Sequence, residues 1–424
     1  MYLKGSKWRM DKQRRQRRTN PAIVVLILVL IGLVWYFDQY VMEELPIAQV
    51  PTPTPTPIPE SLELEADRLV DEGNLHQAVD TYKQAIFVSS GLPNLPGLYV
   101  KLAHTEILVG EYDEAKTSAE NALLLNDQNP QALAELGWAY SFLGNELEAE
   151  KALLQALELN PDSVEAHAYY AELLADQADY EGAAIHSRQA IQLDNKSLVA
   201  LRARGYVLYY TGNYEEAAQQ FEQAIAINDR VADLHQFLGL IYWTLGRYDE
   251  AIERFNVADT FDPDNPLPDT YISRIYLGIG EYAKAAQFAR SAVENEPTNP
   301  IRWGNWGIAL YKNLQYQESI DAFRYAIRGG QTEDGVVVNG LALDYDNAEY
   351  FYMYGLALAN TRQCSEALPI FQALIANVPT DEVAIGNADA GIEICEQYVS
   401  SEPATGLQPV ELTPTPEAGS NSSP

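Results

Sequence analysis

The amino-acid sequence predicts an all-α protein, an α-solenoid of repeated helix–turn–helix units, with one transmembrane helix before it. Two observations predict this class. Small residues recur at a 34-residue interval through most of the chain, and an uncharged apolar run follows a basic amino terminus. The hydrophobic share of 47% over 424 residues is ordinary for a protein that buries a core.

The amino-terminal segment is predicted to anchor the chain in a membrane. Residues 1–20 form a basic tail with eight Lys or Arg and one acidic residue, and residues 21–42 hold the transmembrane helix. The charge-free run within it, Pro21–Phe37, spans about 26 Å as a helix, close to the roughly 30 Å hydrocarbon core. Since cytoplasmic flanks of membrane helices are rich in Lys and Arg, the basic tail is expected in the cytoplasm. Everything beyond residue 42 is expected on the other side of the membrane. A cleaved signal peptide is the disfavoured alternative, because three aromatic residues end the run and no small-residue cleavage site follows.

Beyond the tail, the chain is strongly acidic. The remaining 404 residues carry 20 basic and 59 acidic side chains. A body with this balance repels the phosphate backbone, so the sequence argues against nucleic acid as a partner.

Two segments rich in proline and threonine flank the repeated region. The predicted spacer spans residues 43–58. From Pro51 it alternates proline with threonine or isoleucine, which predicts an extended polyproline-II conformation because proline fixes φ and removes a backbone donor. Residues 400–424 have a similar composition and are predicted to be a disordered tail.

The repeat is defined by a column of small residues. A second small residue follows twelve positions after each member, and a turn residue, most often glycine, stands between the two. That turn glycine is lost at Leu314 and Arg362. Small residues let two helices approach closely, and glycine supplies the positive φ that ends the first helix. The column reads Ala66, Ala103, Gly137, Ala171, Gly205, Gly239, Ser273, Gly307 and Gly355, with six consecutive steps of 34 residues.

This pattern resembles the tetratricopeptide-repeat (TPR) family, most completely in the unit LVALRARGYVLYYTGNYEEAAQQFEQAIAINDR at 198–230. The resemblance implies a right-handed superhelix of about nine helix–turn–helix repeats over residues 59–381, with a capping helix at 382–399. An insertion at 331–345 is expected as a loop, or as a strand pair built on Val336–Val338 and Leu341–Leu343. The units are expected to start near residues 59, 96, 130, 164, 198, 232, 266, 300 and 348.

The resemblance also implies a concave groove, lined by the first helices, that binds a peptide segment of a partner protein. Aromatic side chains there supply contact area, and arginine can clamp a carboxylate. The alternative is that these aromatic residues pack between neighbouring units. The expected groove residues are Trp138, Arg202, Tyr206, Tyr209, Gln236, Trp243, Tyr271, Arg274, Ile308, Tyr311 and Tyr352.

Two cysteines, Cys364 and Cys395, are too few for a disulfide framework or a zinc quartet. The stacking that the resemblance implies brings the two together. The hypotheses left open are a disulfide that fastens the capping helix in an oxidising compartment, and two small buried thiols.

The sequence contains no recognisable catalytic, cofactor or metal motif. The pattern Gly278-Ile-Gly280 resembles part of a dinucleotide loop but falls on a repeat turn. Acidic pairs such as Asp262 and Asp264 lack calcium-loop spacing and are interpreted as capping or loop residues. We therefore expect no cofactor, no metal and no enzyme activity. The expected function is a scaffold or assembly factor of the bacterial cell envelope. A self-associating structural array and an enzyme with a TPR substrate holder are the alternatives, and the sequence does not predict the oligomeric state.

Overall fold

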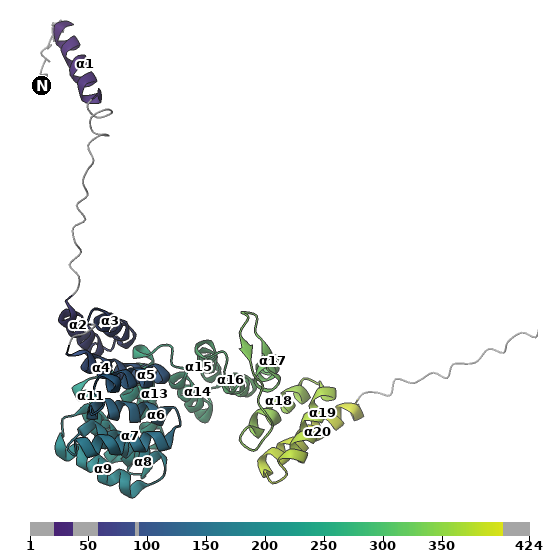
Figure 1. Cartoon of the computed structure of the whole chain (residues 1–424). Coiled ribbons are helices and arrows are strands. Elements are labelled where there is room, and N and C mark those ends of the chain that lie inside the picture. Colours follow the sequence, from purple (N-terminus) through teal and green to yellow (C-terminus); the bar gives the residue numbers. More distant parts are fainter. Residues whose placement is uncertain (1–20, 37–57, 90–92, 402–424) are drawn as a thin grey trace, which may run out of the picture. The chain divides into compact units, whose positions relative to one another are not determined.

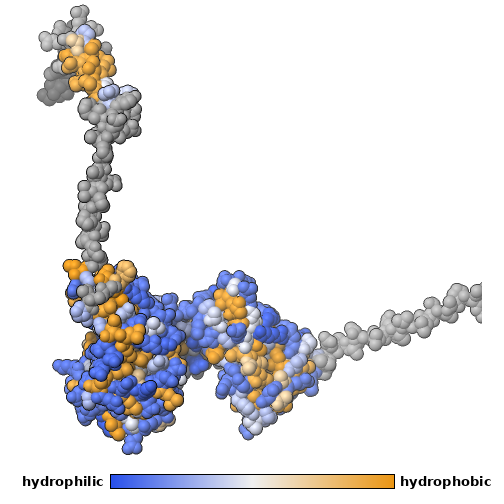
Figure 2. All heavy atoms as spheres, viewed as in Figure 1, coloured by the Kyte–Doolittle hydropathy of each residue, from blue (hydrophilic) through white to orange (hydrophobic). Residues whose placement is uncertain are grey.

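The computed structural model describes residues 21–36, 58–89 and 93–401, which belong to two separate units, 1–57 and 58–424. In the first unit, helix α1 (Pro21–Tyr36) has 16 residues, and its apolar side chains are exposed (Figure 2). Among the described residues, no helix combines the length and the apolar character needed to cross a bilayer. The rest of the predicted anchor, residues 37–42, lies outside the described residues, as do the basic tail, residues 43–57 of the spacer and residues 402–424 of the tail.

The described part of the second unit is an α-helical solenoid, in which consecutive helices form antiparallel hairpins (Figure 1). From the second hairpin onward, each first helix packs against its own second helix and against the first helix of a neighbouring hairpin. Helix α20 (Glu382–Ser401) packs against the last hairpin. The hairpins are α2 (Pro59–Asp71) with α3 (Leu75–Val88), α4 (Leu95–Leu108) with α5 (Tyr112–Leu125), α6 (Pro130–Phe142) with α7 (Glu146–Leu159), α8 (Val164–Asp176) with α9 (Tyr180–Leu193), α10 (Leu198–Tyr210) with α11 (Tyr214–Ile227), α12 (Ala232–Thr244) with α13 (Tyr248–Phe261), α14 (Pro266–Ile279) with α15 (Tyr282–Asn295), α16 (Pro300–Lys312) with α17 (Tyr316–Arg328), and α18 (Ala348–Asn360) with α19 (Cys364–Asn377).

The turn inside each hairpin keeps a left-handed residue even where glycine is absent. Glycine holds this position in most hairpins, with φ between 71° and 83° from Gly73 to Gly280. Ala178, Leu314 and Arg362 adopt the same conformation, with φ of 60°, 62° and 62°. A positive φ costs a residue with a Cβ about 1–2 kcal/mol. Packing of the hairpin therefore overrides local preference at these three positions.

The glycines of the small-residue column leave room for one large side chain. A Cβ on Gly205 would lie 2.7 Å from the ring of Phe221, and one on Gly307 would lie 2.8 Å from Phe323. In both cases the large residue comes sixteen positions later, on the second helix of the same hairpin. Where the column holds alanine at Ala103 and Ala171, the counterparts Ala119 and Ser187 are small, whereas Ala66 is followed by the buried Tyr82. Glycine thus occurs where the second helix presents a bulky, fully buried side chain.

The hairpins begin and end at recognisable residues. Side chains of Asn129, Ser163 and Ser197 accept hydrogen bonds from the first free backbone N–H groups of α6, α8 and α10. Helices α7 and α13 end two residues before Pro161 and Pro263, because the residue preceding a proline is driven out of the helical region.

The insertion between the last two hairpins forms a short strand pair, but not the expected one. Strand β1 (Gly330–Gln331) pairs antiparallel with β2 (Val337–Val338). The expected partner strand, Leu341–Leu343, does not form. Instead, the Leu341 N–H donates to the Ala326 carbonyl (2.9 Å), and Leu341 and Leu343 pack on the core of the last hairpins. Their apolar side chains are thus partly buried against helices rather than in a sheet.

Candidate functional site

Two adjoining cavities lie along the first helices of the amino-terminal hairpins, each with a volume of about 540 Å³. The first is lined by α4, α6, α8, α10 and α12, by the start of α3 and by the loop after α13. The second is lined by α2, α4, α6 and α10 and by the loop between α11 and α12. Both contain Leu108, Trp138, Arg202 and Val231 in their walls. We call the two cavities together the hollow.

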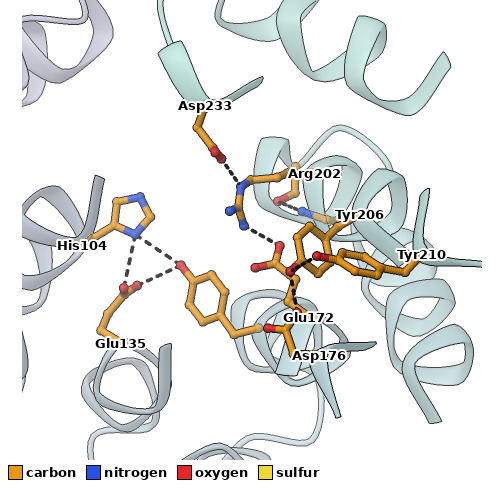
Figure 3. A network of polar contacts seen from close by, with 11 residues as sticks. His104, Glu135, Glu172, Asp176, Arg202, Tyr206, Tyr210 and Asp233 are labelled. Atoms are coloured by element: carbon orange, nitrogen blue, oxygen red, sulfur yellow. Dashed lines mark hydrogen bonds and ion pairs between the residues drawn. The ribbon is translucent and has the colours of Figure 1, made fainter. Parts of the chain in front are cut away.

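Arg202 is the central charge of the hollow and is held by two carboxylates (Figure 3). Its Nη1 donates to Glu172 Oε1 (2.5 Å), and its Nε donates to Asp233 Oδ2 (2.6 Å). The side chains of Arg202 and Glu172 are each 7% exposed, and that of Asp233 is 34% exposed. The three residues come from α10, α8 and the start of α12, which are neighbouring first helices. Because the repeat gives these helices one orientation, they turn the same face toward the groove, where Arg202, Glu172 and Asp233 meet from different positions in their units.

The charge balance of this trio is reflected in the pKa values. Burial alone would lower the pKa of Arg202, but the charges of Asp233 and Glu172 outweigh burial and raise it. Burial raises the pKa of the Glu172 carboxyl above its ordinary value, with Arg202 opposing only part of that effect. Since one guanidinium faces two carboxylates, the trio is left with an excess of negative charge.

Beside Arg202, a second polar group surrounds Glu135. His104 Nδ1 lies 3.3 Å from Glu135 Oε2, and the Tyr169 hydroxyl donates to Glu135 Oε1 (3.2 Å). Burial would lower the pKa of His104, but the Glu135 charge and hydrogen bond raise it. The Tyr169 ring stacks on Trp138 with centroids 4.3 Å apart, and Arg202 lies 5.3 Å from the Trp138 ring centroid. This contact links the two polar groups through the Trp138 indole.

Tyr206 completes the polar lining. Its hydroxyl donates to Asp176 Oδ1 (2.5 Å) and lies 3.5 Å from the hydroxyl of Tyr210. Burial raises the pKa of the Asp176 carboxyl, and the hydrogen bond from Tyr206 opposes this. The Tyr206 ring also packs edge-on against Phe237, another residue of the hollow.

Of the groove residues expected from sequence, four line the hollow: Trp138, Arg202, Tyr206 and Gln236. The others lie elsewhere. Tyr209, Trp243 and Tyr271 pack on the core of the middle hairpins. The ring centroids of Trp243 and Tyr271 lie 6.0 Å apart. Ile308, Tyr311 and Tyr352 belong to the core of the last hairpins, and Arg274 is exposed.

The expected role of Arg202 as a clamp for a partner's carboxylate does not fit its surroundings. Its donors already face two carboxylates of the chain itself. Sequence reasoning missed these acids although a signal existed. Glu172 stands eight positions after the expected unit start at 164, the phase of Trp138 and Tyr206, and Asp233 stands one position after the unit start at 232.

The hollow is bridged on one side by a contact between distant hairpins. Arg230 Nη1 donates to the backbone carbonyl of Glu72 (3.1 Å), 158 residues earlier in the chain. A Cβ on the next residue, Gly73, would lie 2.9 Å from Arg230 Cβ. Gly73 and Arg230 line the first cavity, and Asp71 and Asp229 line the second. The two cavities therefore flank this contact.

Within the described residues, no group of three or more His, Cys, Asp or Glu side chains is arranged to hold a metal ion. Near the carboxyl terminus, Cys364 and Cys395 are joined in a disulfide, with their Cα atoms 5.6 Å apart. The bond ties the start of α19 to α20.

Comparison with known proteins identifies the repeat type. Tetratricopeptide-repeat family models match residues 130–163, 202–266 and 305–382. These segments are tetratricopeptide repeats. The solenoid has the fold of the solved APC/C hetero-tetramer Cut9-Hcn1, with a TM-score of 0.55 and 12% identity over 87% of this chain and 82% of that one. It also has the fold of the human IFIT1 dimer with PPP-AAAA, with a TM-score of 0.53 and 15% identity over 80% and 83%.

Among curated proteins, sperm-associated antigen 1 of Rattus norvegicus is 28% identical over 121 residues. That match spans 28% of this chain and 13% of the rat protein. At identities of 12% and 15%, the likeness to the two solved structures concerns the fold alone.

Proposed function

We propose that this chain is a membrane-anchored, non-catalytic scaffold or assembly factor of the bacterial cell envelope that holds a peptide segment of a partner protein in the hollow. Tetratricopeptide-repeat proteins typically bind protein partners without catalysing a reaction. The observation that carries the proposal is the hollow itself. Its two cavities of about 540 Å³ each fall within the ordinary range of binding sites.

The lining of the hollow fits a peptide. Phe142, Phe237 and Phe261 supply apolar contact area, and Tyr206 and Gln236 add polar groups. Such a combination of aromatic surface with a few placed polar groups is typical of sites that recognise side chains and backbone together.

The proposed location follows from the charge pattern of residues 1–42. The basic tail would stay in the cytoplasm, the apolar segment would anchor the chain, and the solenoid would face the outside. The Cys364–Cys395 disulfide supports this arrangement, because disulfides persist in oxidising compartments. Alkaline carbonate extraction of membranes tests the anchor, and protease added to spheroplasts tests the orientation. Release of the full chain by carbonate, or an intact solenoid after protease, would contradict the proposed location.

A photo-crosslinking amino acid tests the hollow directly. Placed at Gln236, which lines the first cavity, the crosslinker should capture a partner protein in native membranes. The matched control carries it at Tyr282, an exposed aromatic residue outside both cavities. A product at Gln236 and none at Tyr282 supports binding in the hollow.

Other products would favour the alternatives. Two copies of this chain joined through either position would favour a self-associating structural array. Equal capture of the same partner at both positions would show that binding does not use the hollow.

A further inference from the structure

The hollow is strongly acidic, even for this chain. Five carboxylates and two arginines line the first cavity, and the second adds Asp71 and Asp229 with no further Lys or Arg. Both arginines are engaged within the protein. Arg202 pairs with Glu172 and Asp233, and Arg230 donates to the Glu72 carbonyl.

Within the described residues, five of these seven carboxylates lack a cationic side chain, and one of the five, Asp176, accepts a hydrogen bond from the Tyr206 hydroxyl. The ion pairs formed by residues of the hollow are those of Arg202 with Glu172 and Asp233 and that of His104 with Glu135. Asp71, Asp229, Asp262 and Asp264 take part in none of them. Asp262 Oδ2 accepts a hydrogen bond from the Asn265 amide (3.1 Å).

These four carboxylates lie on both sides of the bridging contact. Asp71 and Asp229 line the second cavity, and Asp262 and Asp264 line the first. Burial raises the pKa of Asp262, which the Asn265 hydrogen bond and the nearby His76 only partly oppose. A carboxylate in this state gains from a positive charge brought close to it.

The wall between the acids is apolar. Trp138 is shared by both cavities, and Phe237 and Phe261 line the first. Such rings accept aliphatic side chains, and they also attract ammonium and guanidinium groups placed over their faces. The net charge of −32 of the whole chain would speed the approach of a cationic segment.

We propose that the occupant of the hollow is an extended, cationic segment of a partner protein, with Lys or Arg side chains that reach the free carboxylates at both cavities and apolar side chains between them. This inference rests on the proposed function and gives the chemistry of its partner. It differs from the interpretation that an arginine of the groove clamps a carboxylate of the partner.

Three fluorescein-labelled peptides of one length test the proposal against the full chain in nanodiscs, by fluorescence anisotropy. They share glycine and valine residues and differ only in carrying Lys, Gln or Glu at alternate positions. The Lys peptide should bind most tightly, the Gln peptide about tenfold more weakly and the Glu peptide not measurably, and rising salt should weaken the Lys peptide.

Two matched variants separate the hollow from the acidic surface. In the first, Asp71, Asp229, Asp262 and Asp264 are replaced by Asn. In the second, the exposed Glu114, Glu120, Glu148 and Glu158 of helices α5 and α7 are replaced by Gln, which changes the net charge equally. We expect the first variant to bind the Lys peptide about tenfold more weakly and the second to bind it within twofold of the wild type.

Each failure has a distinct meaning. Equal binding of the Lys and Gln peptides to the wild-type chain overturns the inference, whatever the variants do, and leaves the proposed function standing. Equal weakening by both variants also overturns it, because the charge would then act from the whole surface. If no peptide binds and the Gln236 crosslinker captures no partner, the proposed function fails as well.

Discussion

Arg230, which lines the hollow, donates a hydrogen bond to Glu72, although 158 residues separate the two in the chain. The guanidinium donates to a backbone carbonyl, so the contact does not depend on the Glu72 side chain. Gly73 is required beside it, because a Cβ there would lie 2.9 Å from Arg230 Cβ and 3.0 Å from its carbonyl oxygen. The first hairpin is thus fitted against the loop between α11 and α12.

Gly73→Ala should separate these two segments. Gly73 and Gly212 have φ values of 75° and 76°, so alanine at either costs about 1–2 kcal/mol of stability through the backbone. Only Gly73 has Arg230 beside it, whereas nothing lies within 4 Å of a Cβ on Gly212. Spin labels at the exposed Gln77 and Gln219 should report a longer and broader distance distribution for Gly73→Ala, but not for Gly212→Ala. Identical distributions in the two variants would show that the contact does not hold the hairpin.

Arg202→Met should destabilise the hairpins around the hollow. The substitution keeps most of the side-chain volume but leaves Glu172, with its side chain 7% exposed, without a counter-ion. Breaking a buried pair from one side costs about 3–5 kcal/mol. The double variant Arg202→Met/Glu172→Leu should regain most of that loss, because it removes the stranded carboxylate. Urea unfolding followed by circular dichroism measures both, and a double variant no more stable than Arg202→Met would refute this explanation.

His104 should stabilise the protein more at mildly acidic pH than at alkaline pH. Its pKa is raised in the folded state, so the folded protein holds the proton more tightly than the unfolded chain does. The stabilisation is therefore complete below the ordinary pKa of 6.5 and is lost as the pH rises through the raised value. The groups facing the ring are Glu135, Tyr169 and Trp138, with the charges of Glu165 and Arg202 also acting on it.

The His104→Gln variant isolates this effect. Melting temperatures of wild type and variant are compared at about pH 6 and about pH 8 at constant ionic strength. The difference between the two proteins should be larger at the lower pH, since Gln keeps a hydrogen-bond donor but does not titrate. A larger difference in melting temperature at about pH 8 than at about pH 6 would contradict the stabilisation by protonated His104.

The sequence was sufficient to locate the helices because the repeat is local. Each hairpin is defined by residues at most 34 positions apart, and the sixteen-residue spacing between Gly205 and Phe221 already couples the two helices. The hollow was not predictable in the same way. It depends on how far the stacked hairpins turn, which brings Glu72 next to Arg230, and no periodicity encodes that contact.

The negative charge of the hollow could not be predicted from the sequence either, for a simpler reason. Arg202 is conspicuous in the sequence, but Glu172 and Asp233 lie about thirty residues before and after it and neutralise it only after stacking. At the insertion, Leu341 and Leu343 alternate as strand residues do. Alternation cannot distinguish a sheet partner from a segment that covers a helical core.

Gly391→Ala should loosen α20, whereas Gly386→Ala should not. A Cβ on Gly391 would lie 2.1 Å from Cζ of Phe371, a ring that is fully buried in the last hairpin. Overpacking of this kind costs about 1–3 kcal/mol. Nothing lies within 4 Å of a Cβ on Gly386, so alanine there should stabilise the helix by up to about 1 kcal/mol. Hydrogen exchange of α20 measures both, and equal exchange in the two variants would contradict the close packing.

The Cys364–Cys395 disulfide should hold α20 in place more than it stabilises the rest of the array. It closes a loop with a sequence separation of 31 residues, for which chain entropy gives about 3–4 kcal/mol. In a solenoid each hairpin contacts mainly its neighbours, so the loss in Cys364→Ser/Cys395→Ser should appear as faster hydrogen exchange in α19 and α20, with little change near the hollow. Thiol titration of the denatured, unreduced wild-type protein is the control and should find no free thiol. Two free thiols would exclude the bond and, with it, the support that the disulfide gives to an oxidising location.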